Sequence, residues 1–186
     1  MSKFVLIDGH SILNRAFYGV PIFTNSEGLH TNAVFGFLNI MFKIIDSKQP
    51  DYMAVAFDVH QPTFRHEMFK DYKGTRKPMM EELREQVPVI KELLQKMNIT
   101  TVELPGYEAD DVIGTLSKKG EKAGMEVDVI SGDRDLLQLA SDHITICIPK
   151  TKKGQTTVEE YNTEGVRKLY KVTPTEFIDV KALMGD

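Results

Sequence analysis

Two dense clusters of carboxylates, each placed directly after a short apolar run, constrain this chain more than any other feature of its sequence. The first follows residues 101–104 and the second follows residues 127–130, and each opens a stretch in which apolar residues recur at helical spacing. The five acids are Glu108, Asp110, Asp111, Asp133 and Asp135. Parallel strands end at the same edge of an open sheet, where such folds bind ligands. The two clusters are therefore predicted to share one site.

Helix capping is the simpler explanation for acids at such positions. Acids in the first turn of a helix complement its dipole and accept hydrogen bonds from its free amides. Capping accounts for one or two acids per helix, but not for dense clusters after two successive strands. Close carboxylates repel each other unless protons or a cation intervene, and hard divalent cations prefer several oxygen ligands. The pattern therefore favours a metal site without naming a reaction.

The rest of the chain alternates apolar strand patterns with helical ones. Asp8 follows an apolar run at 4–7 and Asp58 follows another at 52–57, so both repeat the theme of an acid at a strand end. A fifth strand is expected at 144–148, and residues 156–158 are expected to pair at the sheet edge. A helix is expected after Asp8, with Ser11 as its cap, and another after each acid cluster. Further helices are expected over about 31–47, 79–97, 162–170 and 174–184. Pro88 is expected to kink the second of these, and Thr173 is expected to cap the last. This order predicts one three-layer α/β/α domain on a mainly parallel sheet.

Composition narrows the class of protein. The 41% hydrophobic and 27% charged residues are ordinary for a soluble globular chain. The single cysteine, Cys147, indicates a reducing compartment without disulfides. The longest apolar tract, 33–45, is too short and too interrupted to cross a membrane, and the first residues lead into a strand rather than a signal peptide. A cytoplasmic protein is expected.

The net charge of −4 does not exclude a polyanionic partner. Eight acids are candidates for one site: the five above with Asp8, Asp58 and Asp186. Without these eight, 19 of the 27 acids remain against 23 bases. The remainder of the chain is basic, and bound metal would neutralise much of the site.

Residues 60–77 interleave bases with aromatic residues. The bases are Arg65, Lys70, Lys73, Arg76 and Lys77, and the aromatics are Phe64, Phe69 and Tyr72. Such a segment suits neutralisation of phosphates and stacking on single-stranded bases. The alternative is an exposed basic helix whose aromatic side chains face the core.

Up to seven carboxylates, from four strand ends, would lie together at one edge of the sheet. That number suits two divalent ions that clamp the attacking and leaving oxygens of a phosphoryl displacement. Oxygen ligands indicate Mg²⁺ or Mn²⁺ rather than zinc. The sequence has no Walker or dinucleotide-type glycine loop and no serine nucleophile elbow, so metal-activated water is the expected nucleophile.

Seven short motifs together carry a family resemblance. They are Ile7-Asp8-Gly9, Phe57-Asp58, Phe64-Arg65, Tyr72-Lys73, Glu108-Ala109-Asp110-Asp111, Gly132-Asp133-Arg134-Asp135 and Ala182-Leu183-Met184-Gly185-Asp186. In order and spacing the whole chain resembles the 5′-nuclease domains at the amino end of bacterial DNA polymerase I, in the flap-endonuclease family with its PIN-like fold. The resemblance implies metal-dependent hydrolysis of DNA phosphodiesters at 5′ flaps and nicks in replication and repair.

The resemblance also implies roles for individual residues. The expected ligands of two Mg²⁺ or Mn²⁺ ions are Asp8, Asp58, Glu108, Asp110, Asp111, Asp133, Asp135 and Asp186. Lys73 and Arg76 match the bases that hold the scissile phosphate, in a helical arch at about 60–97. The remaining DNA contacts are expected from Arg15, Phe64, Arg65, Phe69, Lys70, Tyr72 and Lys77.

Family chains continue beyond the residue that matches Asp186, with a further acid, a helical element that grips duplex DNA and, in polymerase I, a polymerase domain. The domain at 1–186 is therefore expected to be truncated, with weak activity by itself. Two alternatives stay open: a stand-alone or inactive nucleic-acid-binding homologue, and a Mg²⁺-dependent phosphatase of small molecules.

Overall fold

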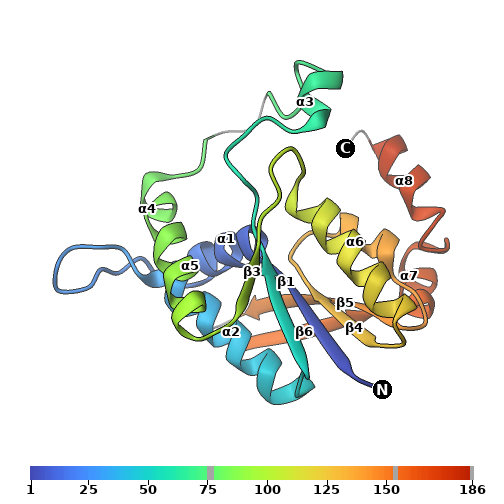
Figure 1. Ribbon diagram of the computed structural model, residues 1–186, viewed down its shortest axis with the longest axis horizontal. Coiled ribbons are helices and arrows are strands. Elements are labelled where there is room, and N and C mark those ends of the chain that lie inside the picture. The colour runs from blue at the N-terminus through green and yellow to red at the C-terminus, as the bar shows by residue number, and fades with distance from the viewer. Residues whose placement is uncertain (75–77, 153–154, 185–186) are drawn as a thin grey trace.

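The computed structural model describes residues 1–74, 78–152 and 155–184 and has a single mixed sheet as its centre. The strand order is β3-β2-β1-β4-β5-β6. Five strands run parallel: β1 (Lys3–Asp8), β2 (Tyr52–Ala56), β3 (Thr100–Val102), β4 (Glu126–Ile130) and β5 (Ile144–Lys152). The last strand, β6 (Gln155–Tyr161), pairs antiparallel with β5. The mainly parallel sheet and its edge pairing, both predicted from the sequence, are confirmed (Figure 1).

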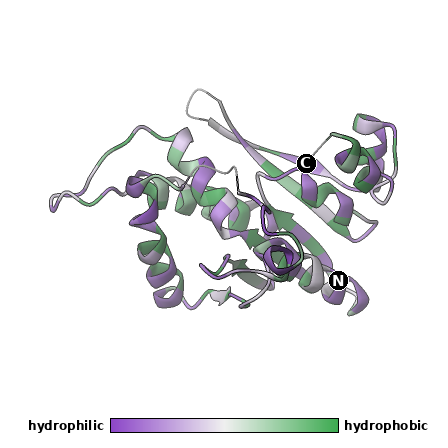
Figure 2. Cartoon of the chain, turned by 90° about the horizontal axis from the view of Figure 1, so that it is seen from above, coloured by the Kyte–Doolittle hydropathy of each residue, from purple (hydrophilic) through white to green (hydrophobic). Residues whose placement is uncertain are grey.

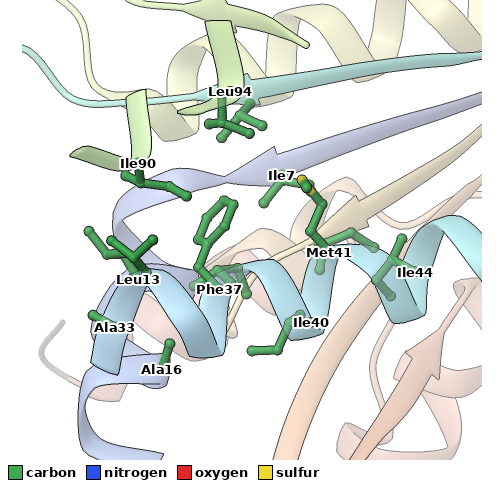
Figure 3. Close-up of a cluster of buried hydrophobic side chains, with 14 of the residues drawn as sticks. Ile7, Leu13, Ala16, Ala33, Phe37, Ile40, Met41, Ile44, Ile90 and Leu94 are labelled. Atoms are coloured by element: carbon green, nitrogen blue, oxygen red, sulfur yellow. The ribbon is translucent and has the colours of Figure 1, made fainter. Parts of the chain in front are cut away.

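Alternate side chains of the central strands enter two separate cores, one on each face of the sheet. Val5 and Ile7 of β1 belong to the first core, with residues of α1 (Gly9–Gly19), α2 (Asn32–Lys48) and α5 (Gln86–Lys96). Figure 3 shows Ile7 beside Phe37 and Met41 of α2, with Ile90 and Leu94 of α5 above them. Each of these helices therefore places one apolar stripe on the sheet.

The opposite face of the sheet is covered by helices from the second half of the chain. Leu6 of β1 packs there with α6 (Ala109–Lys122), the 3₁₀ helix η1 (Asp135–Leu139), α7 (Thr163–Tyr170) and α8 (Phe177–Met184). In Figure 2 the helical segments next to the C-terminus carry both hydrophobic and hydrophilic residues. Within the described ranges, none of the helices combines the length and apolar composition that a membrane span requires.

The start of α1 lies unusually close to the end of β2. A Cβ on Gly9 would come within 2.4 Å of the Phe57 ring, a distance that real side chains do not tolerate. Only glycine allows this approach. It fixes the start of α1, directly after Asp8, against Phe57, directly before Asp58.

Three helix boundaries differ from the sequence prediction. The helix expected over 79–97 is divided into α4 (Glu81–Arg84) and α5, because Pro88 has no N–H to donate to the carbonyl of Arg84, so the expected kink at Pro88 is present as a break one turn earlier. The α-helix expected after the second acid cluster is only the five-residue η1. It ends because the Ser141 hydroxyl accepts the N–H groups of His143 and Ile144 and directs the chain into β5. The helix expected from residue 174 begins at Phe177, and Thr173 caps the turn before it.

The segment predicted as an arch divides into two parts. In α5, Ile90 and Leu94 are fully buried, so this helix belongs to the layer that covers the sheet. The short helix α3 (Phe64–Met68) stands apart from both layers (Figure 1). A turn at 69–74 follows it, in which Tyr72 and Lys73 reach back to the sheet edge.

Candidate active site

A cavity of about 960 Å³ opens at the carboxyl ends of the parallel strands. Six of the eight acids predicted from the sequence line it: Asp8, Asp58, Glu108, Asp110, Asp133 and Asp135. Arg15, Tyr72 and Lys73 line the same cavity. Asp111 is not among the lining residues, and Asp186 lies outside the described residues. The fold thus brings most of the predicted acids together with three of the predicted substrate contacts.

Asp8 joins the two central strands at the base of the cavity. Its Oδ1 accepts the N–H of Ser11 at 3.0 Å, and its Oδ2 accepts the hydroxyl of Ser131 at 2.8 Å. Asp8 therefore caps α1, and the prediction that Ser11 is the cap was wrong, since an acid at the strand end already fills that position. The Ser11 hydroxyl instead accepts the N–H of Gly132 at 2.9 Å. Burial, with repulsion from Asp58 and Asp133, raises the pKa of Asp8 to about 6.

Asp58 connects β2 to the start of α6. Its Oδ1 accepts the N–H of Ala109 at 2.7 Å, and its own N–H donates to Nδ1 of His10 at 3.1 Å. The sequence did not single out His10 for any role, and no motif separates it from an ordinary helix residue. Its involvement is visible only once α1 and β2 are placed side by side.

The first acid cluster begins α6 with a capping box. The Glu108 side chain accepts the N–H of Asp111, and the Asp111 side chain accepts the N–H of Glu108. Capping, the simpler explanation of these acids, therefore applies to both residues. Asp111 also binds the Arg65 guanidinium through two hydrogen bonds of 2.7 and 2.8 Å. These hydrogen bonds from Arg65 lower the pKa of Asp111. Arg65 thus holds Asp111 outside the cavity lining.

Glu108 binds two of the predicted substrate contacts of the 69–74 turn, Lys73 and Tyr72. Lys73 Nζ lies 2.8 Å from Glu108 Oε1, and the Tyr72 hydroxyl donates to Oε2 at 3.2 Å. Lys73 has a φ of 55°, a left-handed conformation that residues with side chains adopt at a cost. The backbone is therefore held in an unfavourable state that aims a cation at the acids.

Asp110 has the most strongly raised pKa of the acids that line the cavity. Burial raises its pKa to about 7, with further repulsion from Asp8, Asp133 and Asp58. Carboxylates from four strand ends therefore interact across the cavity. Proteins relieve such repulsion by keeping a proton on one of the acids or by binding a cation.

The second acid cluster is fixed by its own loop. The Asp133 carboxylate accepts the N–H of Asp135 at 2.9 Å, and the N–H of Asp133 donates to the Ser131 hydroxyl at 3.0 Å. Lys181 of α8 pairs with Asp135 at 2.9 Å. This pairing gives Asp135 a cationic partner from the last described helix.

The donor chemistry of the cavity suits a hard divalent cation, but the carboxylates do not converge on a common point. Among the residues that the structure describes, no three His, Cys, Asp or Glu side chains are arranged to hold a metal ion as they stand. Lys73 and Lys181 account for part of this, because they pair with Glu108 and Asp135 at the edges of the cavity. The assignment of the acids as metal ligands stays a prediction.

Two of the three predicted aromatic contacts in the segment 60–74, Phe64 and Phe69, are exposed to solvent, whereas Tyr72 is half-buried. Phe64 is 38% exposed and Phe69 is 62% exposed, so the alternative in which they face the core is wrong for these two residues. Arg65 stacks on the Phe64 ring at 4.6 Å, and Lys70 is exposed. The predicted contacts Arg76 and Lys77 lie outside the described residues.

Arg15 of α1 also lines the cavity. Its Nε is buried and has no hydrogen-bond partner among the described residues. Burial and the nearby Arg134 lower the pKa of Arg15. A buried donor without a partner carries a free-energy cost that a bound phosphate oxygen would remove.

A mainly parallel α/β sheet with an acid-lined cavity at its strand ends, and a basic aromatic segment above, defines a PIN-like 5′-nuclease fold. The chain belongs to the family described as 5′-3′ exonuclease, N-terminal resolvase-like domain, whose model matches residues 3–171. DNA polymerase I of Bacillus caldotenax and that of Bacillus subtilis are each 52% identical over 184 residues. Each match covers 99% of this chain but 21% of the relative, so the chain spans about a fifth of their length.

Solved structures share the fold. A bacteriophage T5 flap endonuclease in a pseudo-enzyme–product complex with DNA and metal ions superposes with a TM-score of 0.75 at 24% identity. That match covers 99% of this chain and 66% of the other. A bacteriophage T5 5′-exonuclease with bound divalent metal ions (zinc) gives a TM-score of 0.72 at 21% identity, over 97% and 65% of the chains.

Proposed function

We propose that this chain is a metal-dependent nuclease that hydrolyses DNA phosphodiesters from the 5′ side of a flap or nick. The observation that carries the proposal is the Lys73–Glu108 contact in the acid-lined cavity. It joins a basic, aromatic segment to a carboxylate site across 35 residues of sequence. Family membership and the DNA polymerase I relatives support the same activity.

The residues that would hold divalent cations, Mg²⁺ or Mn²⁺, are the lining acids Asp8, Asp58, Glu108, Asp110, Asp133 and Asp135. Asp111 and Asp186 complete the proposed set. When bound, such ions activate water and stabilise charge on the attacking and leaving oxygens. The carboxylates would compensate the ionic charge, and Asp8 and Asp110, whose pKa values are raised, would give up their protons on binding a cation.

The cationic and aromatic residues position the DNA. Lys73 and Arg15 both line the cavity and would bind phosphate oxygens. Phe64, Phe69 and Tyr72 offer rings on which unpaired bases can stack. Arg65, Lys70, Arg76 and Lys77 would neutralise neighbouring phosphates of the single-stranded flap, and residues 60–77 would form the arch over the site.

The DNA polymerase I relatives support a further proposal about the whole protein, namely that a polymerase domain follows in the same chain and that the two act together in replication and repair. The nuclease would then remove the 5′ strand that polymerisation displaces.

One observation favours a second candidate, a DNA-binding homologue without catalysis. In the described part of the chain the carboxylates are partly paired with protein cations instead of converging on one point. Such a protein would bind the same DNA without cleaving it.

The test supplies the protein in excess over each of two substrates, which are at equal concentration in Mn²⁺ and low salt. One substrate is a 5′-labelled flap duplex, and the other is an aryl phosphate monoester. Release of labelled oligonucleotides without turnover of the monoester is the expected result. Binding of the flap without cleavage would support the non-catalytic homologue, and turnover of the monoester alone would support a phosphatase.

A further inference from the structure

His10 lies in the first turn of α1, two residues after Asp8, and lines the cavity. Its ring packs edge-on against Phe57, with centroids 5.4 Å apart and an interplanar angle of 87°. The close approach of Gly9 to the same ring fixes α1 against the end of β2. Phe57 therefore holds the imidazole in one place.

The hydrogen bond from Asp58 determines the state of the imidazole. The backbone N–H of Asp58 donates to His10 Nδ1 at 3.1 Å. Because Nδ1 accepts this bond, it carries no proton, and the ring proton of the neutral imidazole lies on Nε2. The same Nδ1 lies 3.5 Å from Asp58 Oδ2.

Asp58 needs such support because β2 ends two residues before it, at Ala56. Phe57 still donates its N–H to the carbonyl of Val102, but the next N–H donates to His10. The Asp58 side chain is 49% exposed, so its surroundings alone do not fix it. Its carboxylate is bound on the other side by the N–H of Ala109 at 2.7 Å.

We propose that His10 is a positioning residue for Asp58. His10 of α1 and the Ala109 N–H of α6 hold Asp58 from two sides, and together they set where its carboxylate enters the cavity. The predicted effect of His10 on DNA cleavage rests on the proposed function. The hydrogen bond between Asp58 and His10 does not, since it exists without substrate. Residues that orient a site in this way typically contribute roughly ten- to a hundredfold to affinity or activity when removed.

Two substitutions separate the hydrogen bond from the packing. His10→Phe keeps an aromatic ring against Phe57 but removes the acceptor. His10→Asn loses the ring but returns an oxygen acceptor near the position of Nδ1. His143→Asn is the matched control, because His143 is half-buried and pairs with Glu126 at the opposite end of the sheet.

The first measurement is amide hydrogen exchange at Asp58 in the full chain, without metal or DNA. In His10→Phe this amide should exchange roughly tenfold faster, while the amides later in α1 keep their protection, which shows that the helix remains folded. His10→Asn should restore most of the protection, and His143→Asn should leave it unchanged. Unaltered exchange at Asp58 in His10→Phe would overturn the proposal.

The second measurement is single-turnover cleavage of the flap substrate in Mn²⁺. His10→Phe should cleave roughly tenfold more slowly, and His10→Asn should recover most of that loss. Equal loss in both variants would mean that the ring, not the acceptor, matters, and would contradict the proposal. If the wild-type chain itself does not cleave, the proposed function fails, while the exchange result still decides the role of His10.

Discussion

Replacing Asp110 by asparagine should make the metal-free protein more stable at neutral and alkaline pH. Asp110 is half-buried, and its pKa is raised to about 7 by burial and by the charges of Asp8, Asp133 and Asp58. An ionised carboxylate at this position therefore opposes folding. Asparagine has nearly the same shape and carries no charge, so the substitution removes this opposition without creating a cavity.

The sign and size of the effect follow from the two pKa values. In the unfolded chain Asp110 loses its proton near the ordinary pKa of 3.8, and in the folded chain near 7. The folded state therefore binds more protons between these values, and its stability falls as the pH rises through that window. The rise in pKa corresponds to at most about 4 kcal/mol once Asp110 is ionised. Asp8 titrates in the same cavity and shares part of this energy.

The assay is urea denaturation of wild type and Asp110→Asn at pH 5 and pH 8 with a chelator present. The variant should gain stability relative to wild type on going from pH 5 to pH 8, by about 1 to 2.5 kcal/mol, because part of the total energy is already lost by wild type at pH 5. Asp142→Asn, at an exposed turn, is the control and should show no such gain. An equal difference in stability at both pH values would refute the account of charge repulsion in the cavity.

Three further perturbations test other parts of the site. Lys73→Ala should slow flap cleavage by roughly 10²–10³ while weakening DNA binding far less, measured by single-turnover kinetics and equilibrium binding, and wild-type rates would remove Lys73 from the chemistry. Gly9→Ala should cost about 1–3 kcal/mol in urea denaturation, because its Cβ would overlap the Phe57 ring, and an unchanged midpoint would contradict the close approach. Millimolar Mn²⁺ should raise the melting temperature of wild type more than that of Asp133→Asn, and an equal rise in both proteins would place the ion elsewhere.

The sequence was sufficient for the parts of the site that depend on strand position. An acid after an apolar run lies at a strand's carboxyl end, and parallel pairing brings such ends to one edge. For this reason Asp8, Asp58, Asp110 and Asp133 were predicted together and line one cavity. The sheet was predictable on the same grounds, because apolar runs and alternation report burial directly.

Contacts between distant side chains were not predictable, because residue spacing does not determine where a side chain points. Nothing in the sequence indicates that Arg65 binds Asp111 or that Lys181 binds Asp135. The same limit applies to helix type: three leucines after Asp135 suggest an α-helix, but the turn at Ser141 permits only a 3₁₀ helix. His10 was missed because its role depends on the approach of α1 to β2.

Cleavage of a 5′-flap DNA by Asp110→Asn, under single-turnover conditions in saturating Mn²⁺, tests the central claim most directly. Asp110 lies among the acids of three other strand ends, and its replacement preserves the shape of the cavity while removing one charge. If the cavity is the site of hydrolysis, the variant should bind the flap as wild type does and cleave it at least roughly a hundredfold more slowly. Cleavage by Asp110→Asn at the wild-type rate would contradict the assignment of the acid-lined cavity as the active site.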